Sequence, residues 1–265
     1  MMSSSPSFDG QSILVVGATS EIGKYIADAF LVAGGNVTIA SRNIQNLEKI
    51  AKGYGARPGR CLSMMMDVRD PRSVTTIIKA TLKEFGRLDV VVNVAAVNFL
   101  ASADTLSYSG LKAVLDVSAL GTFNVCKGAF KYWFKEHGGH IINISATLHH
   151  GATAKQLHAS AGKAAQESIT RTLALEWGRY GIRVNALAPG PISDTVGMAI
   201  LVPDPKARER VGKATPIGRL GTPQEVADIV LFMASEKAKL FNGAIVIADG
   251  GAILTGATRT VVAEE

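Results

Sequence analysis

GATSEIG occupies residues 17–23, directly after the apolar run ILVV at residues 13–16 and at the start of a stretch with helical periodicity near residues 22–34. Glycine at position 17 allows the tight turn from a strand into a helix, and glycine at position 23 lets a ligand approach the N-terminus of that helix. Free N–H groups and the dipole at a helix N-terminus favour a phosphate group. The stretch therefore predicts a phosphate-binding loop, although a strand-to-helix turn that binds no ligand has the same pattern.

Outward from this loop, short apolar runs rich in β-branched residues alternate with longer amphipathic stretches. This alternation is typical of a parallel sheet covered by helices on both faces. We predict an α/β fold: a single Rossmann-type doubly wound domain with a seven-stranded parallel sheet. The predicted strands are residues 13–16, 36–40, 61–66, 89–94, 140–145, 183–187 and 244–247, and the predicted helices lie near residues 22–34, 71–86, 108–137, 158–180 and 223–235.

The domain organisation follows from the same pattern. Residues 1–10 are Ser-rich and predict a disordered lead-in, residues 11–256 form the single domain, and residues 257–265 form a tail. Residues 193–220 contain three prolines and are too long for a simple turn, so we interpret them as a substrate lid. Neither a secretory signal nor a C-terminal peroxisomal address is visible. The cytosol is therefore the default location, with a peroxisomal-type organelle or a mitochondrion left open.

The composition excludes two broad classes of protein. With 47% hydrophobic and 19% charged residues, the 265-residue chain is too apolar for a disordered protein and too rich in charge for a membrane-embedded one. The net charge of +6 leaves nucleic acid, an anionic membrane surface and a phosphorylated cofactor open as partners. Two cysteines, Cys61 and Cys126, are too few for a disulfide framework, so we expect buried, reduced thiols in an intracellular protein.

The end of the second predicted strand bears on the choice of cofactor. An NAD-binding fold places an acidic residue there for the ribose 2′-hydroxyl, whereas this chain has Ser41 followed by Arg42. A guanidinium suits a 2′-phosphate, so the sequence favours NADPH over NADH. A solvated arginine after a strand is the alternative.

Four further motifs carry a resemblance that covers the chain from Ser12 to about Thr255. They are MDV at residues 66–68, NVAA at residues 93–96, PG at residues 189–190 and DGG at residues 249–251. With the glycine loop they resemble the short-chain dehydrogenase/reductase family. The resemblance implies that the cofactor contacts Gly17, Thr19, Ser20, Glu21, Ile22, Gly23, Ser41, Arg42, Asp67, Val68, Asn93, Ala95, Lys163, Pro189, Gly190 and Ile192.

The catalytic positions depart from the family pattern of Asn, Ser, Tyr and Lys. Lys163 is present, but Ala159 stands at the Tyr position, Ala146 at the Ser position and Ser118 at the Asn position. A ketone reductase needs an acid to protonate the localised alkoxide that it forms, so the loss of the phenol disfavours that reaction. Hydride addition to a conjugated thioester instead gives a delocalised anion, which hydrogen-bond donors and a bound water can serve.

One branch of the family resembles this chain most: the peroxisomal-type 2,4-dienoyl-CoA reductases. The resemblance rests on AAVNFL at residues 95–100, GTFNV at 121–125, HASAGKAA at 158–165 and LEWG at 175–178. It implies an NADPH-dependent homotetramer that assembles through the helices near residues 108–137 and 158–180 and reduces an acyl-CoA. Lys163 and Ser118 would then be catalytic, and Asn98 and Phe99 would contact the substrate. The basic charge of the predicted lid adds Arg208 as a further substrate contact.

The charged residues and the histidines bear on the partners of the protein and on its alternative functions. Residues 203–220 of the predicted lid carry five Lys or Arg residues and two acidic residues, a local charge of +3 that suits coenzyme A phosphates, although a solvated basic helix has the same composition. Basic residues do not interleave with aromatic ones, so we expect neither nucleic-acid binding nor membrane insertion. No metal is expected, and His149, His150 and His158 are interpreted as loop or core histidines. A short-chain reductase of oxo-acyl or alcohol substrates and a non-catalytic NADP-binding protein remain the alternative functions.

Overall fold

The computed structural model describes residues 6–255 of the chain. In this part of the chain seven parallel strands form one sheet in the order β3-β2-β1-β4-β5-β6-β7, which confirms the predicted α/β fold. The order reverses between β1 and β4, where doubly wound sheets open a crevice beyond the carboxyl ends of their strands. The strands are β1 (Ser12–Val16), β2 (Asn36–Ser41), β3 (Cys61–Met65), β4 (Val90–Asn93), β5 (Gly139–Ile144), β6 (Ile182–Pro189) and β7 (Ile245–Ala248).

The long helices lie where the periodicity predicts them. They are α1 (Glu21–Val32), α3 (Pro71–Phe85), α7 (Leu157–Trp177) and α10 (Pro223–Ala234). The predicted helix near residues 108–137 is continuous but not uniform. It consists of α4 (Tyr108–Leu115), the π-helical η1 (Asp116–Gly121), α5 (Thr122–Ala129), the π-helical η2 (Phe130–Phe134) and α6 (Lys135–His137).

Several helices were not predicted. They are α2 (Ile44–Gly53), α8 (Val196–Leu201), α9 (Pro205–Ala214), α11 (Ala252–Thr255) and the 3₁₀ turns η3 (Gly178–Tyr180) and η4 (Glu236–Ala238). In α2 the apolar residues Ile44, Leu47, Ile50 and Ala51 have helical spacing and pack against the core, so the sequence carried a helix signal that the prediction missed. Two of the others, α8 and α9, lie inside the segment interpreted as a lid.

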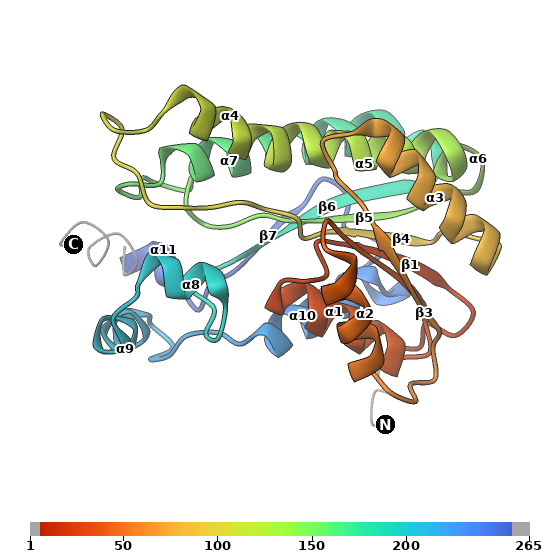
Figure 1. Ribbon diagram of the computed structural model, residues 1–265, viewed down its shortest axis with the longest axis horizontal. Helices are drawn as coiled ribbons and strands as arrows, with labels where there is room; N and C mark the ends of the chain where they lie inside the picture. Colours follow the sequence, from red (N-terminus) through yellow and green to blue (C-terminus); the bar gives the residue numbers. More distant parts are fainter. Residues whose placement is uncertain (1–5, 256–265) are drawn as a thin grey trace.

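The helices cover both faces of the sheet. Figure 1 shows α3, α5 and α7 on one side of the strands and α1, α2 and α10 on the other, with α8, α9 and α11 grouped at one end. The alternation of side chains along β1 divides its residues between two cores. Ile13 and Val15 pack with α1 and α10, whereas Leu14 and Val16 pack with α3, α5 and α7. Within residues 6–255 no helix is both long and apolar enough to cross a membrane.

Two sequence-based expectations about burial were wrong. Phe8 lies in the segment expected to be a disordered lead-in, but it is fully buried, packs edge-on against Phe30 and donates its N–H to Ala33 O. The run of three methionines at residues 64–66 predicts core positions, yet Met65 is 63% exposed because it ends the edge strand β3. The rest of the lead-in, residues 1–5, and the predicted tail lie outside the described residues.

Candidate active site

The glycine loop has the geometry that its sequence predicts. Gly17 has a φ of 86°, and a Cβ there would lie 2.5 Å from Ala95 N on the neighbouring strand connection. A Cβ at Gly23 would lie 2.6 Å from Gly17 O. Ser20 caps α1: its Oγ accepts the Gly23 N–H at 3.1 Å and donates to Gly17 O at 2.9 Å. Two glycines without room for a side chain thus leave the N-terminus of α1 open to a phosphate group.

Glu21 begins α1, and its carboxylate contacts the start of α8. Val196 donates its N–H to Glu21 Oε2 at 3.3 Å, and Lys24 Nζ lies 3.6 Å from Oε1. Glu21 therefore joins the glycine loop to the segment after β6. The carboxylate caps a backbone N–H on another helix, and the resemblance alone gave no indication of this contact.

Charged and hydroxyl groups gather at the ends of β2 and β3. Thr19 Oγ1 and Ser41 Oγ are hydrogen-bonded at 2.9 Å. Arg69 donates to both oxygens of Asp67 and lowers the pKa of that carboxyl, and the charge of Arg42 adds to the effect. Arg42 itself is exposed and forms no ion pair within residues 6–255. Two guanidinium groups near one carboxylate make this end of the loop positive.

Val68 lies between this charged region and the long helix. It is nearly buried, and a Cβ at Gly121 would lie 2.6 Å from Val68 Cγ2. Asn124 Nδ2 donates to Val68 O at 2.9 Å. The contact fixes the turn after β3 against η1, the segment that carries Ser118.

The side chain of Asn93, one of the residues expected to contact the cofactor, points into the interior of the fold. Its Nδ2 donates to Asn143 Oδ1 at 2.8 Å, and Asn143 Nδ2 donates to Thr170 Oγ1 at 2.8 Å. All three side chains are buried. The amide therefore ties β4 to β5 and β5 to α7, because a buried amide needs internal partners.

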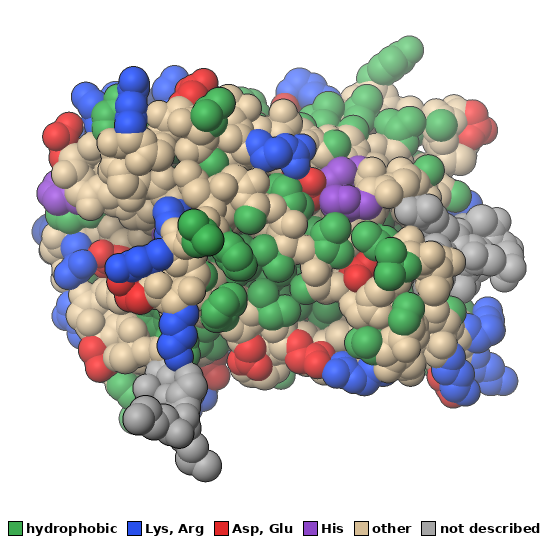
Figure 2. All heavy atoms as spheres, turned by 180° about the vertical axis from the view of Figure 1, so that it is seen from behind, with side chains coloured by type: hydrophobic (Ala, Val, Ile, Leu, Met, Phe, Trp, Pro, Cys, Tyr) green, Lys and Arg blue, Asp and Glu red, His purple; other side chains and the backbone are tan. Residues whose placement is uncertain are grey.

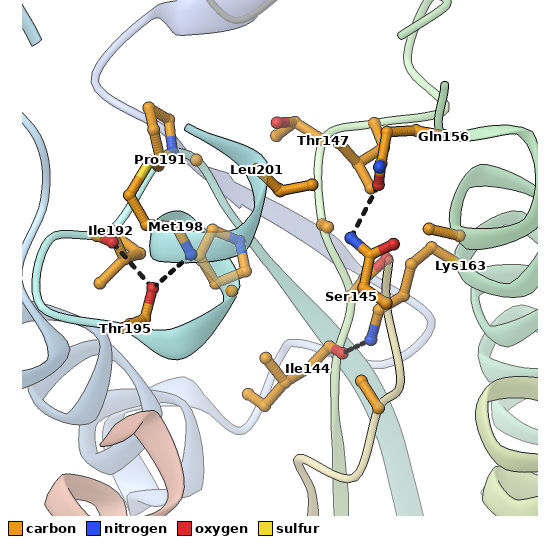
Figure 3. A pocket seen from close by; sticks show the side chains of 18 of the residues that line it. Ile144, Ser145, Thr147, Gln156, Lys163, Pro191, Ile192, Thr195, Met198 and Leu201 are labelled. Carbon is orange, nitrogen blue, oxygen red and sulfur yellow. Dashed lines mark hydrogen bonds between the residues drawn. The ribbon is translucent and has the colours of Figure 1, made fainter. Parts of the chain in front are cut away.

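A cavity of about 210 Å³ lies beyond the carboxyl ends of β4, β5 and β6. Figure 3 shows Ile144, Ser145, Thr147, Gln156 and Lys163 on one side of it and Pro191, Ile192, Thr195, Met198 and Leu201 on the other. Its lining is predominantly apolar. The sequence-predicted residues that line it are Ile22, Asn98, Ser118, Lys163, Pro189, Gly190 and Ile192, together with Ala146 and Ala159.

Lys163 is the charged residue of this cavity. Its Nζ donates to Ile144 O at 2.5 Å and to Gln166 Oε1 at 3.2 Å, which leaves one of its three N–H groups free for the cavity. Burial lowers the pKa of Lys163 to about 8, and the negative charge of Glu167 opposes that shift. Ala159, one turn earlier on α7, supplies no acid.

A chain of hydrogen bonds connects Lys163 to the π-helical segment. Gln166 Nε2 donates to Thr122 Oγ1 at 2.9 Å, and Thr122 Oγ1 donates to Ser118 O at 2.8 Å. Ser118 is buried against Gly162, where a Cβ would lie 2.9 Å from Ser118 Cβ. Sequence reasoning missed Gln166 and Thr122. Their spacing of three residues after Lys163 and four after Ser118 was the available signal.

Two of the three predicted substrate residues do not line the cavity. Asn98 does, and its Nδ2 donates to Gln156 Oε1 at 2.7 Å. Phe99 instead stacks on His158 with ring centroids 4.1 Å apart, and its carbonyl accepts from His158 Nε2. Arg208 lies on α9, outside the cavity lining, and its Nη2 lies 3.5 Å from Pro203 O. A motif gives the position of a residue, not the direction of its side chain.

The segment from residue 193 to residue 220 forms one wall of the cavity through α8. Thr195 caps α8 by accepting the Met198 N–H at 3.1 Å. Part of the basic charge of this segment is neutralised: Lys213 lies 2.7 Å from Glu209, and Arg219 lies 2.6 Å from Glu225 and lowers the pKa of that carboxyl to about 2. The local excess of +3 predicted from the sequence is therefore reduced by Glu225, which lies outside the segment.

The residues fit a dinucleotide cofactor. The glycine positions where a Cβ would collide form a cradle at the N-terminus of α1, at the switch point of the sheet. From this cradle the positive region around Arg42 lies at the ends of β2 and β3, and the cavity with Lys163 lies at the ends of β4 to β6. Phosphate, adenosine and nicotinamide ends thus each have a matching surface.

Comparisons with known proteins identify the family. A family model described as Enoyl-(Acyl carrier protein) reductase matches residues 17–253. The (3E)-enoyl-CoA-producing peroxisomal 2,4-dienoyl-CoA reductase of Danio rerio is 43% identical over 93% of this chain and 83% of its own length. The probable (2E)-enoyl-CoA-producing 2,4-dienoyl-CoA reductase of Bacillus subtilis (strain 168) is 40% identical over 91% of this chain and 96% of its own.

A comparison with solved structures supports the same family. A short chain dehydrogenase from Bacillus anthracis superimposes with a TM-score of 0.84 at 36% identity, covering 92% of this chain and 97% of its own. The chain belongs to the short-chain dehydrogenase/reductase family of oxidoreductases. The relatives from Danio rerio and Bacillus subtilis are both named 2,4-dienoyl-CoA reductases, the branch expected from the sequence. Their names differ in the product, which is a (3E)-enoyl-CoA for the first and a (2E)-enoyl-CoA for the second.

Proposed function

We propose that the protein is an NADPH-dependent reductase of 2,4-dienoyl-CoA thioesters in the oxidation of unsaturated fatty acids. The observation that carries this proposal is the cavity around Lys163, which is apolar and has alanine at positions 146 and 159. An apolar cavity with one lysine and no phenol accommodates a conjugated acyl chain better than it serves carbonyl reduction. The names of the relatives support the same substrate class.

The chemistry divides between the cofactor and the chain. A bound reduced nicotinamide supplies a hydride to the conjugated diene, and the thioester then carries the delocalised negative charge. Lys163 is held by Ile144 O and Gln166 Oε1, so its remaining N–H points at a defined place in the cavity. There it stabilises the anion and orients a water that protonates carbon.

Ser118 supports the proton delivery. Ser118 lines the cavity together with Lys163, and its carbonyl accepts a hydrogen bond from Thr122 Oγ1. A serine hydroxyl holds a water as donor or acceptor but is a weaker base than a carboxylate. We therefore assign Ser118 the role of positioning the water, with Lys163 as the charged partner.

The preference for NADPH rests on Arg42. It is exposed beside the Thr19–Ser41 hydroxyl pair and has no carboxylate partner in the described part of the chain. A 2′-phosphate placed there would gain a charge-assisted hydrogen bond.

Residues 193–220 act as a substrate lid in this proposal. Met198 and Leu201 of α8 line the space for the acyl chain. The basic residues of α9 would supply positive charge for the coenzyme A phosphates. Charge reversal at Arg208 and Arg210 should then raise the KM for acyl-CoA and leave the KM for NADPH unchanged. An unchanged acyl-CoA KM would refute the phosphate contact.

Assembly into a homotetramer completes the proposal. Leu120 in η1 and Leu175 in α7 lie on the two helices expected at the interface, and Leu175 is 85% exposed. Large exposed apolar side chains on neighbouring long helices favour self-association. Sedimentation of the purified chain tests this assignment, which a monomeric mass would refute.

The decisive experiment mixes the protein with NADPH and follows the cofactor absorbance. Oxidation with 2,4-hexadienoyl-CoA and not with acetoacetyl-CoA supports the proposal. The reverse result supports a reductase of oxo-acyl or alcohol substrates, and cofactor binding without turnover supports a non-catalytic NADP-binding protein. Chromatography of the product against (2E)- and (3E)-hexenoyl-CoA then identifies which isomer is made, a point on which the two relatives differ by name.

A further inference from the structure

A second cluster of ligand-type side chains lies on the other side of the loop that lines the cavity. His149 and His150 belong to the turn that follows β5, which a hydrogen bond from His150 N to Thr147 O closes. Glu167 lies on α7, one turn after Lys163. Figure 2 shows histidine side chains next to an acidic one on the face that it presents. The fold thus brings two imidazoles and one carboxylate together from separate elements.

The three side chains are close enough to share one ion. One ligand atom from each lies within 4.8 Å of the others. His149 Nε2 is 2.9 Å from Glu167 Oε2, and His150 Nε2 is 3.3 Å from Glu167 Oε1. The side chain of Glu167 is 3% exposed, that of His149 14% and that of His150 23%. The cluster is therefore largely dry on the carboxylate side and reachable from solvent on the imidazole side.

His149 has no hydrogen-bond partner in this arrangement. Both of its ring nitrogens are buried, and the contact with Glu167 at 2.9 Å lacks hydrogen-bond geometry. A buried polar atom without a partner costs stability, and native structures almost always satisfy such atoms. The imidazole nitrogen and the carboxylate oxygen therefore approach each other closely without the bond that would explain the approach.

A metal ion accounts for this geometry. Bonds of about 2.0 to 2.2 Å from Zn²⁺ to His nitrogen or carboxylate oxygen separate two ligand atoms in a tetrahedron by about 3.3 to 3.6 Å. The contact of 3.3 Å has this separation, and the contact of 2.9 Å is shorter, so a bound ion would move His149 Nε2 and Glu167 Oε2 slightly apart. Two imidazoles and one carboxylate are also a common ligand set for first-row transition metals, with a fourth position for water.

The neighbours of the cluster affect the ion in opposite ways. Ser145 Oγ donates to Glu167 Oε1 at 2.8 Å and fixes the carboxylate, as outer-shell partners of metal ligands do. Arg171 Nη1 lies 3.7 Å from Glu167 Oε2 and competes with a cation for the same oxygen. Because the Arg171 side chain is 55% exposed, it can turn into solvent when an ion binds.

We propose that His149, His150 and Glu167 form a binding site for one divalent first-row transition metal ion, with Zn²⁺ as its preferred occupant. The ion links the loop of residues 146–156 to α7. That loop supplies Ala146, Thr147, Leu148 and Thr153 to the cavity wall, so the ion stabilises the wall from behind. The site departs from the expectation that these histidines are only loop residues, and it does not depend on the proposed reductase function.

The test measures metal binding directly. Full-length protein without a polyhistidine tag is treated with a chelator, dialysed and titrated with Zn²⁺ by calorimetry, and X-ray absorption at the zinc edge then reports the ligands. We expect one Zn²⁺ per chain, a spectrum with two imidazoles and a higher melting temperature in Zn²⁺. No binding, or a spectrum without imidazole, overturns the proposal.

Variants assign the site to its residues. Glu167→Gln keeps the volume and an acceptor for Ser145, and a double variant His149→Ala with His150→Ala removes both imidazoles from a surface turn. Losing a direct ligand costs more than losing an outer partner, so each variant should weaken Zn²⁺ binding at least about 100-fold. His137→Ala, a histidine stacked on Trp133 away from the cluster, should bind like the unchanged protein. Unchanged binding in the double variant overturns the proposal even if Glu167→Gln does not fold.

Discussion

The cofactor loop and the cavity around Lys163 differ in the part of the chain that forms the site: backbone in the loop and side chains in the cavity. In the loop the backbone forms the site: Gly17 and Gly23 leave no room for a Cβ, and Ser20 fixes the helix start. In the cavity the side chains define the site, and three of the four positions of the family pattern hold other residues. A site made of backbone geometry tolerates little substitution, whereas a side-chain site can lose its acid and keep a lysine that serves different chemistry.

Replacing Lys163 should have the largest effect of any single change in the cavity. Lys163→Met removes the only charged donor that lines it among residues 6–255, and the loss of a positioned proton-transfer group costs about 10²- to 10⁴-fold in rate. The measurement is kcat/KM for 2,4-hexadienoyl-CoA. Lys131→Met on the far part of the long helix is the matched control and should retain full activity. A Lys163→Met enzyme with normal turnover would place the chemistry elsewhere.

Lys163 should also make the free energy of unfolding depend on pH, and the sign of this dependence is characteristic of a buried lysine. Its pKa is about 8 in the folded protein and 10.5 in an exposed lysine, so between these values the unfolded chain binds more protons. Stability contributed by this group therefore rises as pH increases from about 8 to about 10.5, by about 3 kcal/mol.

Denaturant unfolding of the wild type and Lys163→Met across this pH range measures the rise as a difference. The comparison is needed because burial raises the pKa of Cys61 to about 11, which lowers stability over part of the same range. Parallel curves for the two proteins would contradict the assignment of a buried, charged lysine.

Changing Arg42 should alter the cofactor preference and leave the catalytic cavity intact. A charge-assisted hydrogen bond contributes about 1.5 to 3 kcal/mol, so Arg42→Asp should shift the ratio of NADPH to NADH affinity toward NADH by about 10- to 150-fold. Fluorescence titration with both cofactors gives the ratio. Arg72→Asp, on the exposed start of α3, is the control for a change of charge alone. Undiminished NADPH affinity in Arg42→Asp would remove the basis for the preference.

Adding one methyl group to the loop should have the smallest effect of the four and is the sharpest test of the backbone argument. Gly17→Ala combines a positive φ with a Cβ 2.5 Å from Ala95 N, and strain of this kind costs about 1 to 3 kcal/mol. We expect lower thermal stability and weaker cofactor binding. Gly55→Ala has a positive φ but open space, so the comparison isolates the collision. Equal losses in the two variants would show that only the φ angle matters.

Most of the fold was accessible from the sequence because it depends on patterns of adjacent residues. The continuous buried run of β1 and the proline at the start of α3 and α10 have local physical causes. The same signal was present at α9, where Asp204 caps the helix and Pro205 begins it, but three prolines in one segment were interpreted as a loop. Helix α2 was missed although Asn43 caps it and its apolar residues have helical spacing.

The site was less accessible, because side-chain direction depends on the packing of distant elements. The position of Lys163 in the cavity followed from the resemblance, and the structure places it there. Asn93 points into a buried amide chain, and Phe99 packs on a histidine 59 residues later. Nothing local to either residue specifies those partners. The hydrogen bonds of Gln166 likewise join residues up to 44 positions apart.

The π-helical segment Asp116–Gly121 has a consequence for how this helix can vary. A π turn joins residues i and i+5, whereas an α turn joins residues i and i+4. The π-helical segment therefore contains one residue more than an α-helix needs to connect the same two ends. Deleting a residue there would turn every preceding side chain by about 100° relative to α5, the angle between successive residues in an α-helix. Val117 or Ala119 would then stand where Ser118 now lines the cavity together with Lys163. The length of the π-helical segment therefore determines, together with its sequence, which side chain occupies the place of Ser118. The loss or gain of a single codon in this segment would exchange that side chain for a neighbouring one.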